Sequence, residues 1–365
     1  MKIGIDVRMI NYSGIGRYIR SLLGEYSKMP VSGGICMFGY PAKLSGYDRF
    51  EVRKFGAPVY SISEQILLPF KAGRLPVFHS PHYNAPLFYK GNLVVTVHDI
   101  IHVKYPPSRK AKLYAGYMLR QVTARAARIV TASEHTKSDL IEYFNVSHEK
   151  IRVIPFGVDE KFHPVEDEEL LSSFKKRHGL PDKFILYVGN LKSHKNIAVL
   201  LKAFKLLKTE KGIEERLVLT TGGNSPGELI RIVSDEGIEQ QVKFLPFIPD
   251  EELPLLYNCA RLFVFPSLYE GFGLPPLEAM ASGVPVVCSN AASLPEVVGE
   301  AAVMCNPRSP EAFANGIYGL LTDDSMREQL ITEGRKRAKL FSWTETAKRT
   351  AAVYEEGTAQ HNSLV

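Results

Sequence analysis

This chain of 365 residues contains only 4 cysteines, a single tryptophan and no long apolar run. The cysteines stand far apart and form no C-x-x-C pair, which excludes a small module built on disulfides. We therefore expect each cysteine to be a small buried apolar residue of a protein in a reducing compartment. The four are Cys36, Cys259, Cys288 and Cys305.

Membrane and export signals are also missing from the sequence. It has no stretch of about 18 apolar residues, so we expect no helix that spans a bilayer. The opening residues MKIGIDV resemble a short strand and lack a charged region followed by about 7–15 apolar residues, so we expect no signal peptide. Both absences predict a cytoplasmic protein.

The composition is that of a globular protein whose charge is divided unevenly. With 45% hydrophobic and 23% charged residues it is neither disordered nor fibrous, and its length suffices for two cores of roughly 150–200 residues each. The net charge is +6, but residues 1–165 hold 23 Lys+Arg against 12 Asp+Glu (+11) and residues 166–365 hold 22 against 27 (−5). We expect the first half to face an anionic partner.

Short β-branched segments alternate with helical segments along the chain. Near-continuous apolar strands separated by helices are typical of parallel sheets covered on both faces. We therefore predict an α/β fold with two doubly wound parallel-sheet, Rossmann-like domains. The predicted strands are residues 3–7, 93–101, 127–133, 151–158, 184–190, 216–223, 242–248, 261–267 and 284–290, and predicted helices include 17–26, 109–128 and 134–143.

Residues 159–183 are charged and contain two prolines, which favours a connection followed by one solvated helix. We place the N-terminal domain at residues 1–164 and the C-terminal domain at 165–342, with a C-terminal helix at 343–357 that packs back on the first domain. In doubly wound folds, ligands bind outside the carboxyl ends of the strands. We therefore expect a site in a central cleft that both domains face.

The first candidate site is the loop MINYSGIGRY at residues 9–18. Gly14 and Gly16 follow the first strand and precede a helix, so their N–H groups could face an anion. The pattern lacks the third glycine of a dinucleotide fingerprint, and no acidic residue ends a strand about 20 residues later, which disfavours NAD binding. The loop is either a tight turn or a contact with a phosphate or sugar.

The second candidate is His98, near the end of predicted strand 93–101, where the strand-end rule places it at the edge of the ligand cleft. His79, His82 and His102 are its neighbours in the sequence. A metal site built on His98 and His102 would need both on one helix face, whereas this segment is predicted as a strand. We therefore expect no metal.

The third candidate is the loop LKSHKN, which follows predicted strand 184–190. Lys195 lies at the predicted start of the next helix, where a cation and backbone amides can meet one phosphate group. Lys192 and His194 are other candidates on the same loop. The alternative is a solvated basic loop with no ligand.

The strongest candidate is the segment FPSLYEGFGLPPLEAMASGVPVV at residues 265–287. A predicted strand leads into a Gly-rich turn at 271–273 and then into a helix opened by two prolines. Glu270 precedes the turn and Glu278 lies about one turn into the helix, so both can face a ligand at the helix N-terminus. A carboxylate can accept both hydroxyls of a ribose, and turn amides suit a diphosphate.

Together these motifs resemble the large family of retaining glycosyltransferases called group 1, which has the GT-B fold. Glu270 and Glu278 form the Glu-x7-Glu element of that family. The resemblance covers nearly the whole chain and is nearest to bacterial mannosyltransferase-like members. Other matching segments are SGIGRY, FHSPHYNAP, TVHDI, TASEHTKSDL, IRVIPFGVDEKFHP, YVGNLKSHKN and SLPEVVG.

The resemblance implies a role for each candidate residue. Lys195 would neutralise the donor diphosphate, Glu278 would bind the nucleotide ribose, and His98 would contact the donor sugar. Glu270 and the amides of the Gly-rich turn would hold the sugar and phosphates, and the first loop would close over the diphosphate. Those backbone positions are Gly14, Gly16, Gly271, Phe272, Gly273 and Leu274.

One residue departs from the family pattern. Many members have an arginine directly after the glycine that matches Gly189, and this chain has Asn190 there. Asparagine carries no charge, so Lys195 would stabilise the leaving group alone or together with another cation such as Arg17.

The implied activity is transfer of a hexose, mannose being the first choice, from a GDP-sugar or UDP-sugar to a glycan or lipid-linked acceptor. Retention would occur by front-face attack, without a metal or cofactor. Two alternatives stay open: a nucleotide-sugar 2-epimerase of the same fold, and a non-catalytic nucleotide-sugar binding protein. We expect no nucleic-acid partner, because no recognised motif accompanies the basic charge.

The basic segment 107–133 has two interpretations. It contains six bases and no acid, interleaved with apolar residues. It could lie on an anionic membrane surface and meet a lipid-linked acceptor, which would add a peripheral contact at the inner face of the cytoplasmic membrane. Alternatively it is an ordinary amphipathic helix that covers the sheet. The six bases are Arg109, Lys110, Lys112, Arg120, Arg125 and Arg128.

Overall fold

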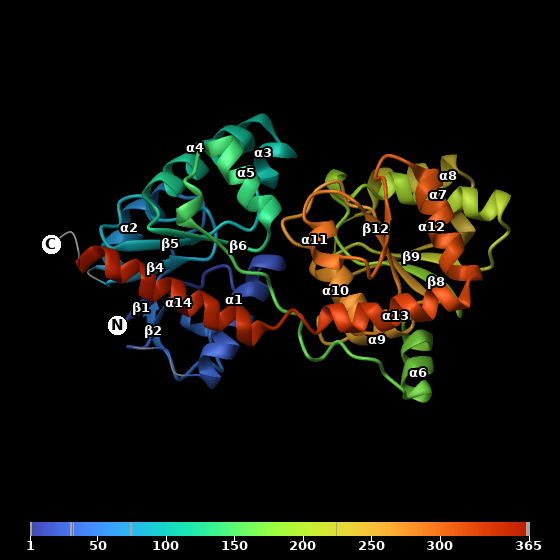
Figure 1. Cartoon of the computed structure of the whole chain (residues 1–365), viewed down its shortest axis with the longest axis horizontal. Helices are drawn as coiled ribbons and strands as arrows, with labels where there is room; N and C mark the ends of the chain where they lie inside the picture. Colours follow the sequence, from blue (N-terminus) through green and yellow to red (C-terminus); the bar gives the residue numbers. More distant parts are fainter. Residues whose placement is uncertain (1, 30, 32, 74, 224, 363–365) are drawn as a thin grey trace. The chain divides into compact units, whose positions relative to one another are not determined.

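The computed structural model describes residues 2–29, 31, 33–73, 75–223 and 225–362, and the chain divides into two compact units. Unit 1 extends to Gly157 and resumes at Ser342, and unit 2 is Val158–Phe341 (Figure 1). Residues 158–164, expected in the first domain, therefore belong to unit 2. Lys161 holds this segment to unit 2, because its Nζ donates to the Asp250 carbonyl at 2.8 Å.

Unit 1 is built on a seven-stranded sheet in the order β3-β2-β1-β4-β5-β6-β7, and each neighbouring pair is parallel. The central strands are buried on both faces, whereas the edge strand β3 is exposed. The order of strands reverses between β1 and β4, which makes this pair the switch point of the sheet. The strands are β1 (Ile3–Asp6), β2 (Ile35–Gly39), β3 (Glu51–Lys54), β4 (Val77–Ser80), β5 (Asn92–Thr96), β6 (Arg128–Thr131) and β7 (Ile151–Val153).

Helices cover both faces of this sheet. The connection through α1 runs toward β2, and the connections through α2, α4 and α5 run the opposite way, so right-handed crossovers place them on opposite faces. Helix α14 packs on α1 and on strands β4, β5 and β6, which puts it on the α1 face. The helices are α1 (Gly14–Lys28), α2 (Ile62–Ala72), α3 (Ile101–Lys104), α4 (Arg109–Arg125), α5 (Glu134–Phe144) and α14 (Trp343–Asn362), with 3-10 turns at Pro41–Lys43 and His148–Lys150.

A buried chain of polar side chains joins the C-terminal helix to the sheet of unit 1. The Tyr354 hydroxyl lies 2.7 Å from Nδ1 of His79, and Nε2 of His79 lies 2.8 Å from the Thr96 hydroxyl. All three side chains are inaccessible to solvent. Helix α14 is thus part of the unit 1 core, and it continues to Asn362, beyond the expected range 343–357.

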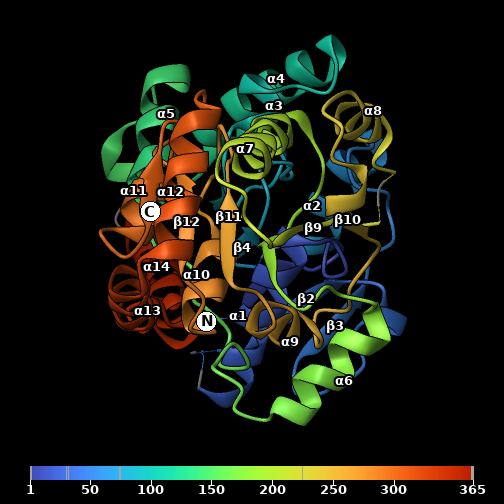
Figure 2. The same cartoon turned by 90° about the vertical axis from the view of Figure 1, so that its right-hand side faces the viewer.

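Unit 2 is built on a six-stranded parallel sheet in the order β10-β9-β8-β11-β12-β13 (Figure 2). Its switch point lies between β8 and β11, and the four-residue cores of both strands are fully buried. The strands are β8 (Phe184–Tyr187), β9 (Arg216–Thr220), β10 (Val242–Leu245), β11 (Leu262–Phe265), β12 (Val286–Ser289) and β13 (Val303–Cys305).

The helices of unit 2 also cover both faces of its sheet. Helix α12 packs on α7, and α13 packs on α10. The helices are α6 (Glu168–His178), α7 (Ile197–Glu210), α8 (Gly227–Asp235), α9 (Leu253–Asn258), α10 (Leu274–Ala281), α11 (Leu294–Val298), α12 (Pro310–Thr322) and α13 (Asp324–Ala338), with 3-10 turns at Ser193–Lys195 and Glu239–Gln241.

The predicted fold class is confirmed: both units are Rossmann-like, with helices on both faces of a parallel sheet. Strand ends differ from the prediction near His98, because β5 ends at Thr96 and residues 101–104 form a helical turn instead of continuing the strand. Strands β2, β3, β4 and β13 were not predicted. Among the described residues, no helix is both long and apolar enough to cross a bilayer.

Candidate functional site

Three of the four candidate segments follow strands at the switch points, one of them in unit 1 and two in unit 2. In unit 2 the loops after β8 and β11 are adjacent because these strands pair in parallel, with Phe263 opposite Leu186. The carboxyl ends of two neighbouring parallel strands lie at one edge of the sheet, where doubly wound folds bind ligands. The sequence candidates of the second half all lie on or directly after these loops.

The loops after β8 and β11 are joined by an ion pair between Lys195 and Glu270. Lys195 Nζ donates to Glu270 Oε1 at 2.6 Å, although the two residues are 75 positions apart in the sequence. Both side chains are mostly buried, with 12% and 14% of their surface exposed. Lys195 Nζ also lies 5.2 Å from the centre of the Phe265 ring. The cation is therefore held at the edge of the sheet, with part of its surface open to solvent.

Lys195 is positioned by a 3-10 turn, Ser193–Lys195, that precedes helix α7. Asn196 follows in a left-handed conformation, with φ 60°, and its side-chain amide donates to the carbonyls of Pro266 and Pro307 at 3.0 and 2.6 Å. Lys195 was predicted at the start of the helix, and it lies in the 3-10 turn directly before α7. Asn196 connects the turn to the segment after β11 and thus brings Lys195 toward Glu270.

Asn190 takes part in shaping the loop after β8. Its Oδ1 accepts the Lys192 N–H at 3.2 Å, and its carbonyl accepts the Tyr187 hydroxyl at 2.7 Å. Asn190 therefore stabilises the turn through hydrogen bonds and adds no charge at this position.

The Gly-rich turn after Glu270 is held by one serine. Ser293 Oγ donates to the carbonyls of Glu270 and Phe272 at 3.0 and 2.7 Å. Gly273 begins helix α10 with φ 119°, and a Cβ there would lie 2.6 Å from Leu294 Cδ2. A side chain at Gly273 would therefore both strain the backbone and clash, so this turn requires glycine. Gly271 and Leu274 flank the same turn.

Glu278 lies deeper than Glu270. Only 2% of it is exposed, and its Oε2 accepts the Tyr257 hydroxyl at 3.0 Å. Tyr257 belongs to helix α9 and is itself fully buried. The two glutamates of the predicted motif thus occupy different environments: Glu270 is paired with a cation near solvent, whereas Glu278 is fixed by a neutral donor inside the unit.

In unit 1, Gly14 and Gly16 open helix α1 directly after the loop that follows β1. A Cβ on Gly16 would lie 2.4 Å from the Ile10 carbonyl oxygen, whereas a Cβ on Gly14 would have nothing within 4 Å. Gly16 is therefore required for the close approach of the helix to the loop. Gly14 has no such packing requirement.

His98 follows β5, and its Nε2 lies 2.9 Å from the carbonyl oxygen of Pro81. A carbonyl only accepts, so Nε2 carries the proton and Nδ1 is the basic nitrogen of a neutral ring. Burial lowers the pKa of His98 to about 4, although the bond to Pro81 acts in the opposite direction. The Tyr18 ring packs edge-on against His98 with a centroid distance of 5.2 Å. His98 is thus a positioned, uncharged imidazole near neutral pH.

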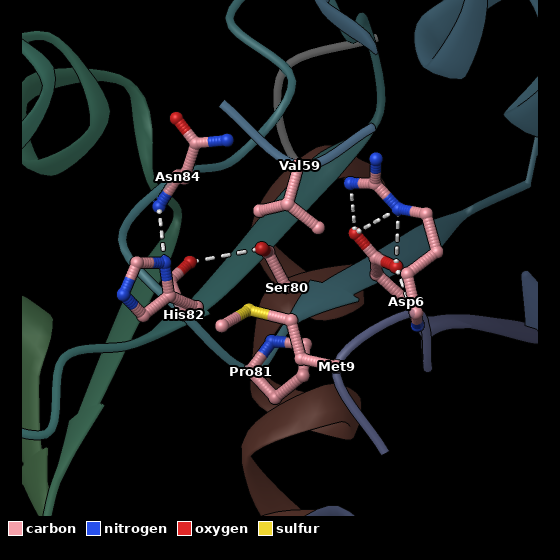
Figure 3. Close-up of a pocket in the computed structure, with 8 residues that line it drawn as sticks. Asp6, Met9, Val59, Ser80, Pro81, His82 and Asn84 are labelled. Atoms are coloured by element: carbon pink, nitrogen blue, oxygen red, sulfur yellow. Dashed lines mark hydrogen bonds and ion pairs between the residues drawn. The ribbon is translucent and has the colours of Figure 1, made fainter. Parts of the chain in front are cut away.

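A small pocket opens at the switch point of unit 1 (Figure 3). In this view Asp6 lies on the right of the pocket and His82 and Asn84 lie on the left, with Val59 above and Met9 below. Burial lowers the pKa of His82 to about 3, so this imidazole is neutral too. The lining residues are Asp6, Arg8, Met9, Val59, Ser80, Pro81, His82 and Asn84.

One wall of this pocket is a buried charge cluster that the sequence analysis missed. Arg8 donates to Asp6 at 2.6 Å and to Glu64 at 2.9 Å, and all three side chains are almost fully buried. Asn84 in turn donates to Glu64. Burial raises the pKa of Glu64, with Arg8 acting against it. The signal in the sequence was the IDVR segment, in which an acid and a base directly follow an apolar strand.

The sequence analysis weighed a metal site on His98 and His102 and disfavoured it. In the structure the two imidazoles have different hydrogen-bond partners. His102 Nδ1 lies 2.9 Å from the Tyr83 hydroxyl, and His98 bonds Pro81. Within the described residues, no group of three or more His, Cys, Asp or Glu side chains is placed to hold a metal ion.

Comparison with protein families matches both units. The family described as Glycosyl transferases group 1 matches residues 170–337, and the Glycosyltransferase Family 4 matches residues 12–162. The first match contains all of the unit 2 candidates, and the second contains the glycine loop and His98.

Individual proteins agree with this result. The O-antigen chain mannosyltransferase B of Escherichia coli is 35% identical over 283 residues, which cover 76% of this chain and 74% of that protein. The serotype-specific mannosyltransferase WbdA of Escherichia coli is 34% identical over 229 residues, 61% of this chain but only 28% of that longer protein. Mannosyl transfer is the activity in both names.

A solved structure shows the same fold. The crystal structure of Anabaena Alr3699/HepE in complex with UDP-glucose superimposes with a TM-score of 0.81 at 18% identity, covering 98% of this chain and 100% of that one. At this identity the likeness concerns the fold alone, and it agrees with the two Rossmann-like units. This chain belongs to the group 1 glycosyltransferases, and it is a glycosyltransferase of GT-B fold.

Proposed function

We propose that this glycosyltransferase moves a mannosyl group from a nucleotide-diphosphate mannose, GDP-mannose being the first choice, to a glycan or lipid-linked acceptor. The sugar is inferred from the two mannosyltransferases that resemble the chain. The observation that carries the proposal is the Lys195–Glu270 pair at the switch point of unit 2. It provides a cation for a diphosphate and a carboxylate for sugar hydroxyls at the edge where such folds bind nucleotides.

On the donor side, each polar group has a distinct task. The leaving diphosphate develops negative charge, which Lys195 and the backbone of the Gly271–Gly273 turn would stabilise. Glu270 would accept hydrogen bonds from sugar hydroxyls once Lys195 turns to the phosphates. Glu278, held by Tyr257, would accept the hydroxyls of the nucleotide ribose. Asn190 adds no charge, so Lys195 is the main cation of this proposal.

The reaction would proceed with retention by front-face attack. The bond from the anomeric carbon to the phosphate oxygen breaks while the acceptor oxygen approaches the same face, through an oxocarbenium-like state. The departing phosphate oxygen takes the proton of the acceptor hydroxyl. In this proposal Lys195 and backbone amides stabilise the leaving charge, and no metal or further cofactor takes part.

On the side of unit 1, His98 would contact the donor sugar as a neutral group. With Nε2 donating to Pro81, its Nδ1 can accept a hydrogen bond from a sugar hydroxyl. The glycine loop Gly14–Gly16 would approach the diphosphate with its backbone. The pocket beside Asp6 and Asn84 lies at the same strand-end edge as His98 and is where an acceptor hydroxyl would enter.

Two measurements test the proposal. The first is thermal unfolding in the presence of GDP-, UDP-, ADP- and dTDP-sugars, because a donor that binds the folded state raises the unfolding temperature. The second is NMR detection of the product anomer with the preferred donor and a mannose-terminated oligosaccharide. We expect GDP-mannose to stabilise most and an α-linked product to form. Epimerised donor without transfer would contradict the proposal, as would stabilisation without turnover or a β-linked product.

A further inference from the structure

Tyr60 lies in the turn before helix α2 with a backbone conformation that is unusual for its residue type. Its φ is 67°, in the left-handed region. Three other non-glycine residues of the described chain have a positive φ, and two of them, Asn145 and Asn196, are asparagines, which tolerate it. A tyrosine with this φ is strained because its Cβ approaches a backbone carbonyl oxygen, whereas a glycine is not. Strain of this kind is concentrated where the side chain has a function.

The turn is fixed on both sides of Tyr60. Before it, Nη1 of the buried Arg8 donates to the Ala57 carbonyl at 2.9 Å. After it, the Ser61 hydroxyl donates to the Pro58 carbonyl at 2.6 Å and accepts a backbone N–H from the first turn of α2 at 3.2 Å. The contacts of the neighbouring residues therefore impose the strained conformation, which fixes the direction of the Tyr60 side chain.

The Tyr60 ring lies at the rim of the pocket in Figure 3. The preceding residue, Val59, lines that pocket, and so does His82. The ring packs edge-on against His82 at a centroid distance of 5.7 Å, and its hydroxyl lies 3.4 Å from His82 Nε2. Nδ1 of His82 accepts the Asn84 N–H at 3.2 Å, so the neutral imidazole carries its proton on Nε2, toward the tyrosine. Although it is held in this way, 43% of Tyr60 is exposed.

A second ring supports Tyr60 from helix α4. Tyr114 packs edge-on against it at 6.0 Å, and the Tyr114 hydroxyl donates to the side-chain oxygen of Asn84. The amide nitrogen of Asn84 donates to Glu64, which binds Arg8 in the buried charge cluster. Both ends of the Asn84 amide are thus engaged, and hydrogen bonds connect the charge cluster to the rings. Tyr60 is the half-exposed end of a buried polar network.

The chemistry of this rim fits a neutral sugar ring better than a phosphate. A phosphate is bound most strongly by a cation, but the guanidinium of Arg8 in the pocket wall is already bound by the carboxylates of Asp6 and Glu64. The imidazole of His82 is uncharged, because burial lowers its pKa to about 3. A hexopyranose combines an apolar face of C–H groups with hydroxyls at its edge. An exposed tyrosine ring beside a small pocket with polar atoms in its wall matches both parts.

We propose that Tyr60 selects the acceptor: its ring stacks on the apolar face of a hexopyranose, one hydroxyl of which enters the pocket between Asp6 and His82. The acceptor is therefore recognised as a sugar and not as a lipid phosphate. This inference rests on the proposed transfer to an acceptor that enters this pocket, and it adds the substrate class and the residue that recognises it. The strained turn keeps the ring beside the pocket.

Kinetics of Tyr60 variants of the full chain test the proposal. The acceptor probes are soluble oligosaccharides that end in mannose, glucose, galactose or N-acetylglucosamine, used with the donor that stabilises the enzyme most. For the preferred oligosaccharide we expect Tyr60→Ala to raise KM about tenfold, the effect of losing one aromatic contact, while kcat at saturating acceptor and the donor KM stay within about twofold. Tyr60→Phe keeps the ring and should retain the native KM.

Two further variants separate the ring from the backbone. Tyr60→Gly also removes the ring but relieves the positive φ. We expect its midpoint of thermal unfolding to lie about 2–4 °C above that of Tyr60→Ala, with the same increase in acceptor KM. The matched control is Tyr143→Ala, which removes a tyrosine of nearly equal exposure, 44%, from helix α5 and should leave the acceptor KM unchanged.

Saturation-transfer NMR measures acceptor binding without turnover. Transfer from the native protein should be strongest to C–H protons on one face of the terminal sugar, and Tyr60→Ala should lose this signal. Oligosaccharide binding without glycosyl transfer would contradict the proposed function and still support the role of Tyr60. Three outcomes would overturn that role: no oligosaccharide of the set binds the native protein, Tyr60→Ala transfers with the native acceptor KM, or a polyprenyl phosphate that carries no sugar binds with the same dependence on Tyr60.

Discussion

Lys195 and Glu270 neutralise each other across 2.6 Å at the carboxyl ends of β8 and β11. In the proposed reaction, a diphosphate bound at this edge would compete with Glu270 for the ammonium group. The glutamate would then become available to sugar hydroxyls, which are neutral and could not displace it from the lysine on their own. The pair therefore keeps both groups oriented before a donor arrives.

Replacing Lys195 with alanine tests this arrangement directly. We expect Lys195→Ala to lower kcat by about 10²–10³, the range for removing one group that stabilises developing negative charge. The matched control is Lys192→Ala, because Lys192 lies on the same loop but is exposed. Steady-state rates with the preferred donor distinguish the two. Equal rates for the Lys195 variant and the native enzyme would show that Lys195 has no role in the reaction.

The two glycines that open helix α1 should respond differently to the same substitution. Gly16→Ala places a Cβ against the Ile10 carbonyl, and we expect a loss of about 1–3 kcal/mol in the free energy of unfolding. Gly14→Ala meets nothing within 4 Å at a helical position and should leave stability unchanged. Urea unfolding followed by fluorescence of Trp343, the single tryptophan, measures both. A loss in Gly14→Ala equal to that in Gly16→Ala would contradict this assignment of packing.

Three buried histidines should make unit 1 sensitive to acid. Burial lowers the pKa of His98 to about 4 and those of His79 and His82 to about 3. An unfolded histidine has a pKa of about 6.5, so the unfolded chain binds more protons between these values. The contribution of these neutral histidines to the free energy of unfolding is therefore fully present above about pH 6.5 and is lost as the pH falls toward 4.

Between pH 7 and pH 5 we expect a decrease of about 2–5 kcal/mol in the free energy of unfolding of unit 1. Urea titrations monitored through Trp343 provide the values. His79→Gln should flatten the dependence on pH, whereas His148→Asn, at an exposed position, should not change it. A stability that does not vary over this range would show that the three histidines are not held neutral.

The cluster around Arg8 should be costly to break. Arg8→Leu leaves the carboxylates of Asp6 and Glu64 buried without a cation, and we expect a loss of about 3–5 kcal/mol. Arg53→Leu breaks the exposed ion pair with Glu51 and should cost at most about 1 kcal/mol. Urea unfolding compares the variants at one pH. A similar small loss for both would mean that the buried cluster adds no stability of its own.

The local hydrophobic pattern of the sequence was sufficient to predict the fold class and most of the strands. Strands of Val, Ile and Leu such as β8 and β11 are recognisable because both faces of a parallel strand are buried and the sequence is apolar throughout. Strand β3, with the sequence EVRK, is exposed at the sheet edge and has no such pattern. Strand β4 was missed because its residues VFHS include a histidine whose polarity is satisfied by partners from other elements.

The sequence by itself determined the fold class, the family, and the residue types of the loops after β8 and β11, because these depend on short-range periodicity and on motif spacing. Only the tertiary structure decided that Lys195 meets Glu270, that Arg8 lies between Asp6 and Glu64, and that Tyr60 remains half-exposed beside His82. Contacts between residues far apart in the chain depend on which strands pair, and the exposure of a side chain depends on what packs against it. Neither quantity is a property of the local sequence.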